Sequence, residues 1–163
     1  MPSENEQLYE TDFYAWTRVQ AKELRRLARA RWNGPLDLKH LAIEVADMGC
    51  EVLHGMESQL ERIIEHLLKL QHSPAQEPRA GWKASVRQAR REIGRRMTPT
   101  LARKLRRSLP RHWAAGRDEA RQALLDYGEA EAADRVPETC PYEFDQLLAL
   151  DWYPPAPGGL TGR

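Results

Sequence analysis

Apolar side chains recur at intervals of three or four residues along the first part of the chain, which is the spacing of one face of an α-helix. The first series predicts a helix over about residues 12–30, with Thr11 or Asp12 as its N-cap. Asn33, Gly34 and Pro35 then indicate a turn, because all three residue types favour turn conformations. The face of this helix consists of Phe13, Trp16, Gln20, Leu24 and Leu27.

A second and much longer apolar series covers residues 38–70, mostly at heptad spacing, with three consecutive four-residue steps in its middle. Gly49 and Gly55 lie in that middle part, and a glycine costs a helix about 1 kcal/mol relative to alanine. We expect one continuous helix that is locally bent or unwound there; two separate helices are the alternative. The stretch HSPAQEPRAG, residues 72–81, ends this helix and forms a loop.

The stretch GWKASVRQARREIGRRM, residues 81–97, predicts a third helix with two contrasting sides. Its apolar side is formed by Trp82, Val86, Ala89, Ile93 and Met97. We place the basic residues on the opposite, outer side; they are Lys83, Arg87, Arg90, Arg91 and Arg95. The apolar side alone explains why the stretch folds, so the surplus of positive charge on the outer side indicates an anionic partner.

Proline positions suggest the remaining boundaries. Thr98 followed by Pro99 is typical of a helix start, since proline is well tolerated in the first helical position. Pro110 is predicted to begin another helix, and Pro141 a short one near the end of the chain.

The composition favours helices. The most frequent residues are alanine, leucine, arginine and glutamate, and there is no alternating run typical of a strand. We therefore predict an all-α, compact, bundle-like domain with one long, locally bent spine helix and shorter helices packed on it. This single domain is expected over residues 9–155, between a disordered N-terminus at residues 1–8 and a disordered tail at residues 156–163.

Charge is unevenly distributed along the chain. Residues 79–111 hold 12 Lys and Arg against 1 Glu, whereas residues 1–78 hold 9 basic against 13 acidic residues. Residues 112–163 hold 4 basic against 10 acidic residues, so a basic block lies between two acidic segments. Asp12, Glu44 and Glu57 stand beside apolar positions, and we expect them to form interhelical ion pairs with Arg25 and Arg90.

Several stretches together resemble the family called domain of unknown function 29, which is common in cyanobacteria and other bacteria. They are YETDFYAW, LDLKHLAIEV, HLLKLQHSP, the tryptophan before the arginine-rich helix, and CPYEFDQLLALDWYP. The resemblance covers about residues 8–155. It implies a compact all-helical fold and, as the family name says, no settled activity.

Motifs for catalysis or cofactor binding are absent from the sequence: there is no P-loop, dinucleotide fingerprint, HExxH or nucleophile elbow. Glu51 and His54 have the spacing of a helical metal-ligand pair, but no second pair accompanies them. We predict no cofactor and no metal. Cys50 and Cys140 stand alone, so we expect reduced cysteines in a cytoplasmic protein. The sequence shows neither a signal peptide nor an apolar run of ~20 residues, so we expect no contact with a membrane.

Three functional hypotheses follow. The first is a non-catalytic protein-interaction or self-association module that uses the basic face of residues 79–111. The second is nucleic-acid binding by the same face, although the sequence pI of 7.8 is low for that class. The third is an enzyme acting on an anionic substrate at His66, Lys69 and Arg90. The residues assigned to binding an anionic partner are Lys83, Arg87, Arg90, Arg91, Arg95, His66 and Lys69.

Overall fold

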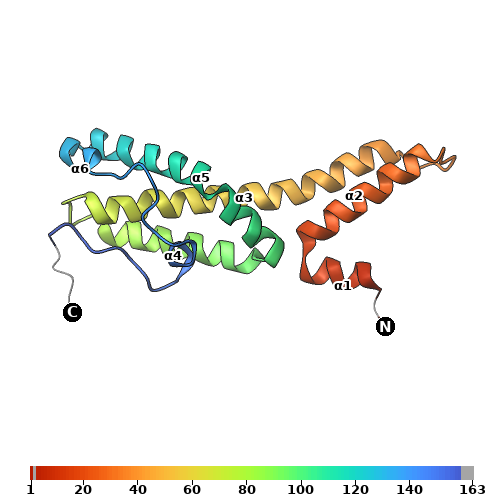
Figure 1. Cartoon of the computed structure of the whole chain (residues 1–163), viewed down its shortest axis with the longest axis horizontal. Helices are drawn as coiled ribbons and strands as arrows, with labels where there is room; N and C mark the ends of the chain where they lie inside the picture. Colours follow the sequence, from red (N-terminus) through yellow and green to blue (C-terminus); the bar gives the residue numbers. More distant parts are fainter. Residues whose placement is uncertain (2, 159–163) are drawn as a thin grey trace. The chain divides into compact units, whose positions relative to one another are not determined.

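The computed structural model describes residues 1 and 3–158, and these residues form seven α-helices and no strand (Figure 1). The all-α fold predicted from the sequence is therefore confirmed. In chain order the helices are α1 (Glu4–Thr11), α2 (Phe13–Arg29), α3 (Leu38–His72), α4 (Arg79–Arg96), α5 (Pro99–Asp126), α6 (Ala130–Asp134) and α7 (Phe144–Leu148). Among the described residues, no helix has the length and apolar character needed to cross a membrane.

Helix α1 corrects our prediction that residues 1–8 are disordered. A reciprocal capping box starts this helix: the hydroxyl of Ser3 accepts from the Glu6 amide at 3.3 Å, and the Glu6 carboxylate accepts from the Ser3 amide at 2.6 Å. The ring of Tyr9 then packs against the rings of Phe13 and Trp16 on α2. Local capping and the two ring contacts of Tyr9 thus order a segment that has no buried residue of its own.

Helix α2 begins where the sequence predicts. The Asp12 carboxylate accepts from the Ala15 amide at 2.9 Å, as expected of an N-cap. Helix α3 is continuous over its 35 residues, so the alternative of two separate helices is wrong. Gly49 does not break the helix but allows close packing on α2: a Cβ atom added there would lie 3.2 Å from the Cβ of Thr17.

The start of helix α5 agrees with the sequence prediction, whereas the predicted helix boundary inside it does not. The Thr98 hydroxyl accepts from the Leu101 amide at 3.3 Å, which is the predicted cap ahead of Pro99. Pro110 does not begin a new helix but lies inside the 28-residue α5. A proline removes one backbone hydrogen bond, and α5 continues because buried residues on both sides of Pro110, such as Leu105 and Trp113, hold it in place.

The last part of the chain is held by two short helices. Helix α6 was not predicted, and α7 begins at Phe144 rather than at Pro141 because Glu143 provides its capping box. The disordered tail predicted at residues 156–163 falls largely on residues 159–163, which lie outside the described residues.

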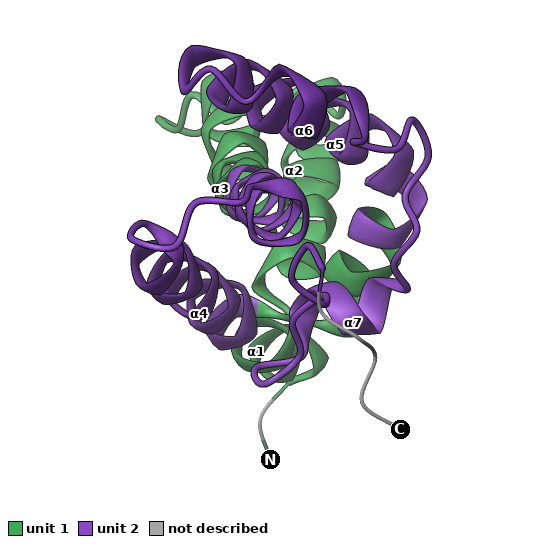
Figure 2. Cartoon of the chain, turned by 90° about the vertical axis from the view of Figure 1, so that its left-hand side faces the viewer, with its two compact units in different colours: residues 1–55, 97–104 green, residues 56–96, 105–163 purple. Residues whose placement is uncertain are grey.

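The chain divides into two compact units, shown in green and purple in Figure 2. Unit 1 comprises Met1–Gly55 and Met97–Lys104, and unit 2 comprises Met56–Arg96 and Leu105–Arg163. Helices α3 and α5 each contribute residues to both units. The two cores differ in kind: the buried apolar side chains of unit 1 are Tyr14, Ala21, Leu38, Ala42, Ala46 and Leu101, whereas large aliphatic side chains dominate unit 2.

Candidate binding surface on helix α4

Helix α4 is fixed in unit 2 by one apolar side. Trp82, Val86, Ala89 and Ile93 are all buried, as their helical spacing predicts. The ring of Trp82 also lies 5.4 Å from the ammonium group of Lys69 on α3. With that side fully used for packing, the opposite side of α4 is left to solvent.

Four basic residues form a continuous row along this outer side. Lys83, Arg87, Arg91 and Arg95 are all exposed and follow one another at intervals of four residues. At a rise of 1.5 Å per residue, successive members stand about 6 Å apart and the row is about 18 Å long. We call these four residues the α4 row.

The members of the α4 row differ in how their charge is used. Arg95 pairs with Glu92 at 3.0 Å, and the ammonium of Lys83 lies 5.4 Å from the ring of Tyr153. Arg87 and Arg91 make no hydrogen bond or ion pair with any described residue. The middle of the row therefore carries two positive charges that the described chain does not neutralise.

Arg90 is not part of this surface, and its prediction as an outer residue is corrected. Its side chain is 2% exposed. Its guanidinium donates to the carbonyl oxygens of Leu147 at 2.8 Å and Trp152 at 2.8 Å, and more weakly to two neighbours, Gln146 and Leu150. A further contact at 5.2 Å joins it to the ring of Tyr153. Arg90 therefore holds the segment that follows α7 rather than an external anion.

Lys69 and His66 are also taken up by internal contacts. Lys69 is 7% exposed, and its ammonium donates to the Glu65 carboxylate at 2.6 Å. The ring of His66 donates from Nδ1 to the Arg62 carbonyl oxygen at 3.0 Å. Burial lowers the pKa of His66, and the nearby ammonium of Lys69 lowers it further. Neither residue belongs to an open anion site, because Lys69 is buried and paired and His66 favours its neutral form.

The catalytic hypothesis rested on these same three residues. The structure gives Arg90 and Lys69 separate partners, namely backbone carbonyls and Glu65. The arrangement therefore leaves this hypothesis without an available cation to bind a substrate.

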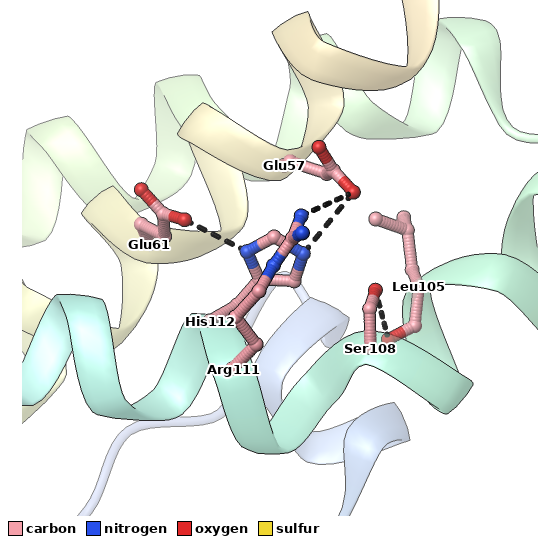
Figure 3. Close-up of polar contacts among 6 residues, drawn as sticks. All are labelled: Glu57, Glu61, Leu105, Ser108, Arg111 and His112. Atoms are coloured by element: carbon pink, nitrogen blue, oxygen red, sulfur yellow. Dashed lines mark hydrogen bonds and ion pairs between the residues drawn. The ribbon is translucent and has the colours of Figure 1, made fainter.

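A polar cluster that the sequence did not reveal links α3 and α5 (Figure 3). His112 is 1% exposed and stands between two carboxylates one helical turn apart. Its Nδ1 lies 2.7 Å from Glu61, and its Nε2 makes an ion-pair contact with Glu57 at 3.2 Å. Arg111 adds a contact to Glu57 at 3.1 Å. Only the Nδ1 contact with Glu61 has hydrogen-bond geometry, and the buried Nε2 has no hydrogen-bond partner among the described residues.

The cluster around His112 ties two helices together rather than forming a pocket for chemistry. The carboxylates of Glu57 and Glu61 meet opposite edges of one ring, so their oxygens do not converge on a common point (Figure 3). Within the described residues no group of three or more His, Cys, Asp or Glu side chains is arranged to hold a metal ion.

The three carboxylates singled out in the sequence have different outcomes. Glu57 is largely buried and forms an interhelical pair as expected, but with Arg111 and His112 rather than Arg25 or Arg90. Asp12 is buried as a helix cap, and Glu44 is exposed. The partial burial of Glu57 could be predicted from its position beside the apolar series. Nothing in the sequence indicated the burial of His112, because its partners are more than 50 residues away.

Comparisons with known proteins agree with this helical arrangement. A crystal structure of an α-helical protein of unknown function from Rhodospirillum rubrum ATCC 11170 is similar, with a TM-score of 0.79 and 28% sequence identity over 88% of this chain and 90% of that chain. A search among curated proteins found no match. The family described as Domain of unknown function DUF29 matches residues 8–153, as the sequence resemblance implied, and the chain therefore belongs to this family.

Proposed function

We propose that this chain is a non-catalytic interaction domain that binds an acidic surface of a partner protein through the α4 row. The observation that carries the proposal is the pair of exposed guanidinium groups at Arg87 and Arg91, which no described residue neutralises. They stand on a helix whose other side is buried, so the row is held on a fixed support. A rigid row of cations is suited to a matching row of carboxylates, and complementary charge of this kind favours fast and selective association.

A protein partner suits the α4 row better than nucleic acid. The exposed side of α4 itself presents small residues, such as Ala84 and Gly94, and its one aromatic neighbour among the described contacts is the ring of Tyr153, which already lies 5.4 Å from the ammonium of Lys83. The row is short, and proteins that neutralise many phosphates carry larger basic areas than four side chains. The binding experiment described next therefore includes nucleic acids as the alternative ligand.

The test uses a labelled helical peptide with glutamates at four-residue intervals as a probe, measured by fluorescence anisotropy. We expect the full chain to bind it, and the double substitution Arg87→Glu with Arg91→Glu to weaken binding at least about 10-fold, because each reversal replaces attraction with repulsion. A matched control is Arg25→Glu with Arg29→Glu, which changes the net charge equally at two exposed arginines of α2. The control should change affinity less than about 2-fold.

The same titration is repeated with double- and single-stranded DNA and RNA over a salt series. Tighter binding to a nucleic acid than to the acidic peptide, lost on reversal of Arg87 and Arg91 and falling linearly with the logarithm of salt, would replace the protein partner with nucleic acid. Equal effects of the α4 and α2 double substitutions would show that only net charge matters, and would overturn a specific role for the row.

A further inference from the structure

Helices α1 and α2 of unit 1 enclose an open groove of about 880 Å³. One residue, Asp12, separates the two helices, and the chain bends sharply there (Figure 1). Side chains of both helices line the groove, among them Tyr9 on α1 and Trp16 on α2. Pockets that bind ligands commonly have volumes of about 300–1,000 Å³, so the groove is large enough for one.

The apolar part of the groove consists of two aromatic rings. Tyr9 and Trp16 meet edge to face, with ring centroids 4.9 Å apart. Tyr9 nevertheless remains 48% exposed, so part of its ring is open to a ligand. The faces of such rings attract cations, and a planar guanidinium group can also stack on them.

The charged part of the groove is acidic. Glu6 and Glu10 both line it and lie one helical turn apart on the same face of α1. Hydrogen bonding to the backbone and side chain of Ser3 lowers the pKa of Glu6, which favours its ionised form. Glu10 makes no hydrogen bond or ion pair with any described residue. No Lys, Arg or His is found among the described residues that line the groove.

The basic residues of α2 do not neutralise these carboxylates. Four of the five lie on the side of α2 opposite Trp16, rotated from it by at least about 120°; they are Arg18, Lys22, Arg25 and Arg29. The fifth, Arg26, pairs with Glu23 at 2.7 Å. The groove therefore combines aromatic rings with unneutralised negative charge, and a cationic ligand complements both.

Neutral amide side chains indicate that this ligand is a peptide. Asn5, Gln7 and Gln20 also line the groove, and their side chains make no hydrogen bond with any described residue. An amide both donates and accepts hydrogen bonds, as a peptide backbone does. A simple ammonium ion has no acceptor and would use only half of this capacity.

The spacing of the carboxylates indicates which cations fit. Residues four apart in a helix, such as Glu6 and Glu10, differ in height by about 6 Å. In an extended peptide, side chains two residues apart point to the same side and stand about 6.6 Å apart. Two arginines separated by one residue therefore match the two carboxylates.

We propose that the groove between α1 and α2 binds an extended segment of a partner protein that contains two arginines separated by one residue. The two guanidinium groups pair with Glu6 and Glu10 and pack against the rings of Tyr9 and Trp16. The amide side chains of the groove bind the peptide backbone beside them. This site lies in unit 1 and the α4 row in unit 2, so the two proposals are independent.

The test measures binding of a labelled peptide, Gly-Ser-Arg-Ala-Arg-Ser-Gly, to the full chain by fluorescence anisotropy at low salt. We expect binding that Glu6→Gln with Glu10→Gln weakens at least about 5-fold, because both ion pairs are lost. Glutamine is accepted at the third position of a capping box, so α1 should remain folded. A wild-type chain that does not bind the peptide would overturn the proposal.

A matched control separates the groove from net charge. Glu4→Gln with Glu44→Gln removes the same charge at two exposed positions of unit 1 that do not line the groove. This control should change the affinity less than about 2-fold. Equal weakening by the two double substitutions would show that only net charge matters and would overturn the site.

Varied probes test the spacing and the nature of the ligand. A peptide of the same composition with adjacent arginines should bind more weakly, because its two side chains point to opposite sides. Replacing both arginines with lysines should also weaken binding, since an ammonium group does not stack on a ring. Equal affinities for these peptides would contradict the assigned contacts. Competition by 1,4-diaminobutane at the concentration of the peptide would replace the peptide with a free amine.

Discussion

Arg90 illustrates how much a single buried guanidinium can organise. It reaches the carbonyl oxygens of residues 146, 147, 150 and 152, which follow or end α7 and have few helical partners. Each of these bonds has a charged donor, and such bonds contribute more than neutral ones. A side chain of α4 therefore helps to hold the irregular end of the described chain, together with the buried Phe144 and Leu147 and the ring contact of Tyr142 with Trp152.

Replacing Arg90 is expected to destabilise the chain strongly. Arg90→Gln should lower the free energy of unfolding by about 3 kcal/mol, because buried carbonyl groups lose their donors. Urea unfolding followed by circular dichroism measures this change. The matched control Arg87→Gln, on the exposed side of the same helix, should change stability by less than about 0.5 kcal/mol. A similar small effect for both would show that the Arg90 contacts carry little stability.

The misplacement of Arg90 in the sequence prediction has a geometric cause. In a helical projection it lies at the edge of the apolar side, directly after Ala89 and three residues before Ile93. An arginine at an edge position can turn outward to water or inward to a polar group. The choice is made by carbonyl groups 56 or more residues further along the chain, which no local pattern reveals.

At the scale of elements, two glycines inside helices have different steric surroundings. A Cβ atom at Gly116 on α5 would lie 2.8 Å from the Glu61 carbonyl oxygen and 2.8 Å from the Cβ of Ile64 on α3. A Cβ atom at Gly94 on α4 would meet nothing within 4 Å. Gly116 thus permits two helices to approach closely, whereas Gly94 has no steric neighbour.

The two glycines predict opposite effects of the same substitution. Gly116→Ala should cost about 1–3 kcal/mol, because the added methyl group must push α3 and α5 apart. Gly94→Ala should raise stability by about 0.5–1 kcal/mol, since alanine favours a helix and meets open space. Thermal unfolding of both variants tests the pair. Destabilisation by Gly94→Ala would show that α4 needs a glycine for another reason.

Helices were predicted well where local periodicity was strong and less well where ends depended on context. The apolar series identified α2, α3 and α4, and Thr98 marked the start of α5. Pro110 misled the prediction, because its local preference to start a helix was outweighed by packing on both sides of it. Helix α1 was missed although Ser3 and Glu6 have the spacing of a capping box.

At the scale of the whole molecule, the two units have unequal cores. Three of the six buried apolar residues of unit 1 are alanines, whereas unit 2 buries many leucines and isoleucines. Burial of a large aliphatic side chain contributes about 1.5–3 kcal/mol, and an alanine contributes much less. The two units are therefore expected to differ in local stability.

Hydrogen exchange detects such a difference. In dilute protein, backbone amides of α2 should exchange faster than those of residues 56–70 in α3, because opening unit 1 exposes less apolar area. Mass spectrometry of peptide fragments resolves the two regions. Equal protection of both would show that the units unfold together.

The sequence by itself determined the helical class, the long α3 and the two-sided character of α4, because these follow from residue propensity and from spacing within one element. The tertiary structure alone decided which polar groups are buried and with whom. Arg90 turns inward, Lys69 pairs with Glu65, and His112 meets two carboxylates of α3. Contacts of this kind join residues on different elements, or depend on which side of an element is covered, so they arise only when the helices have packed.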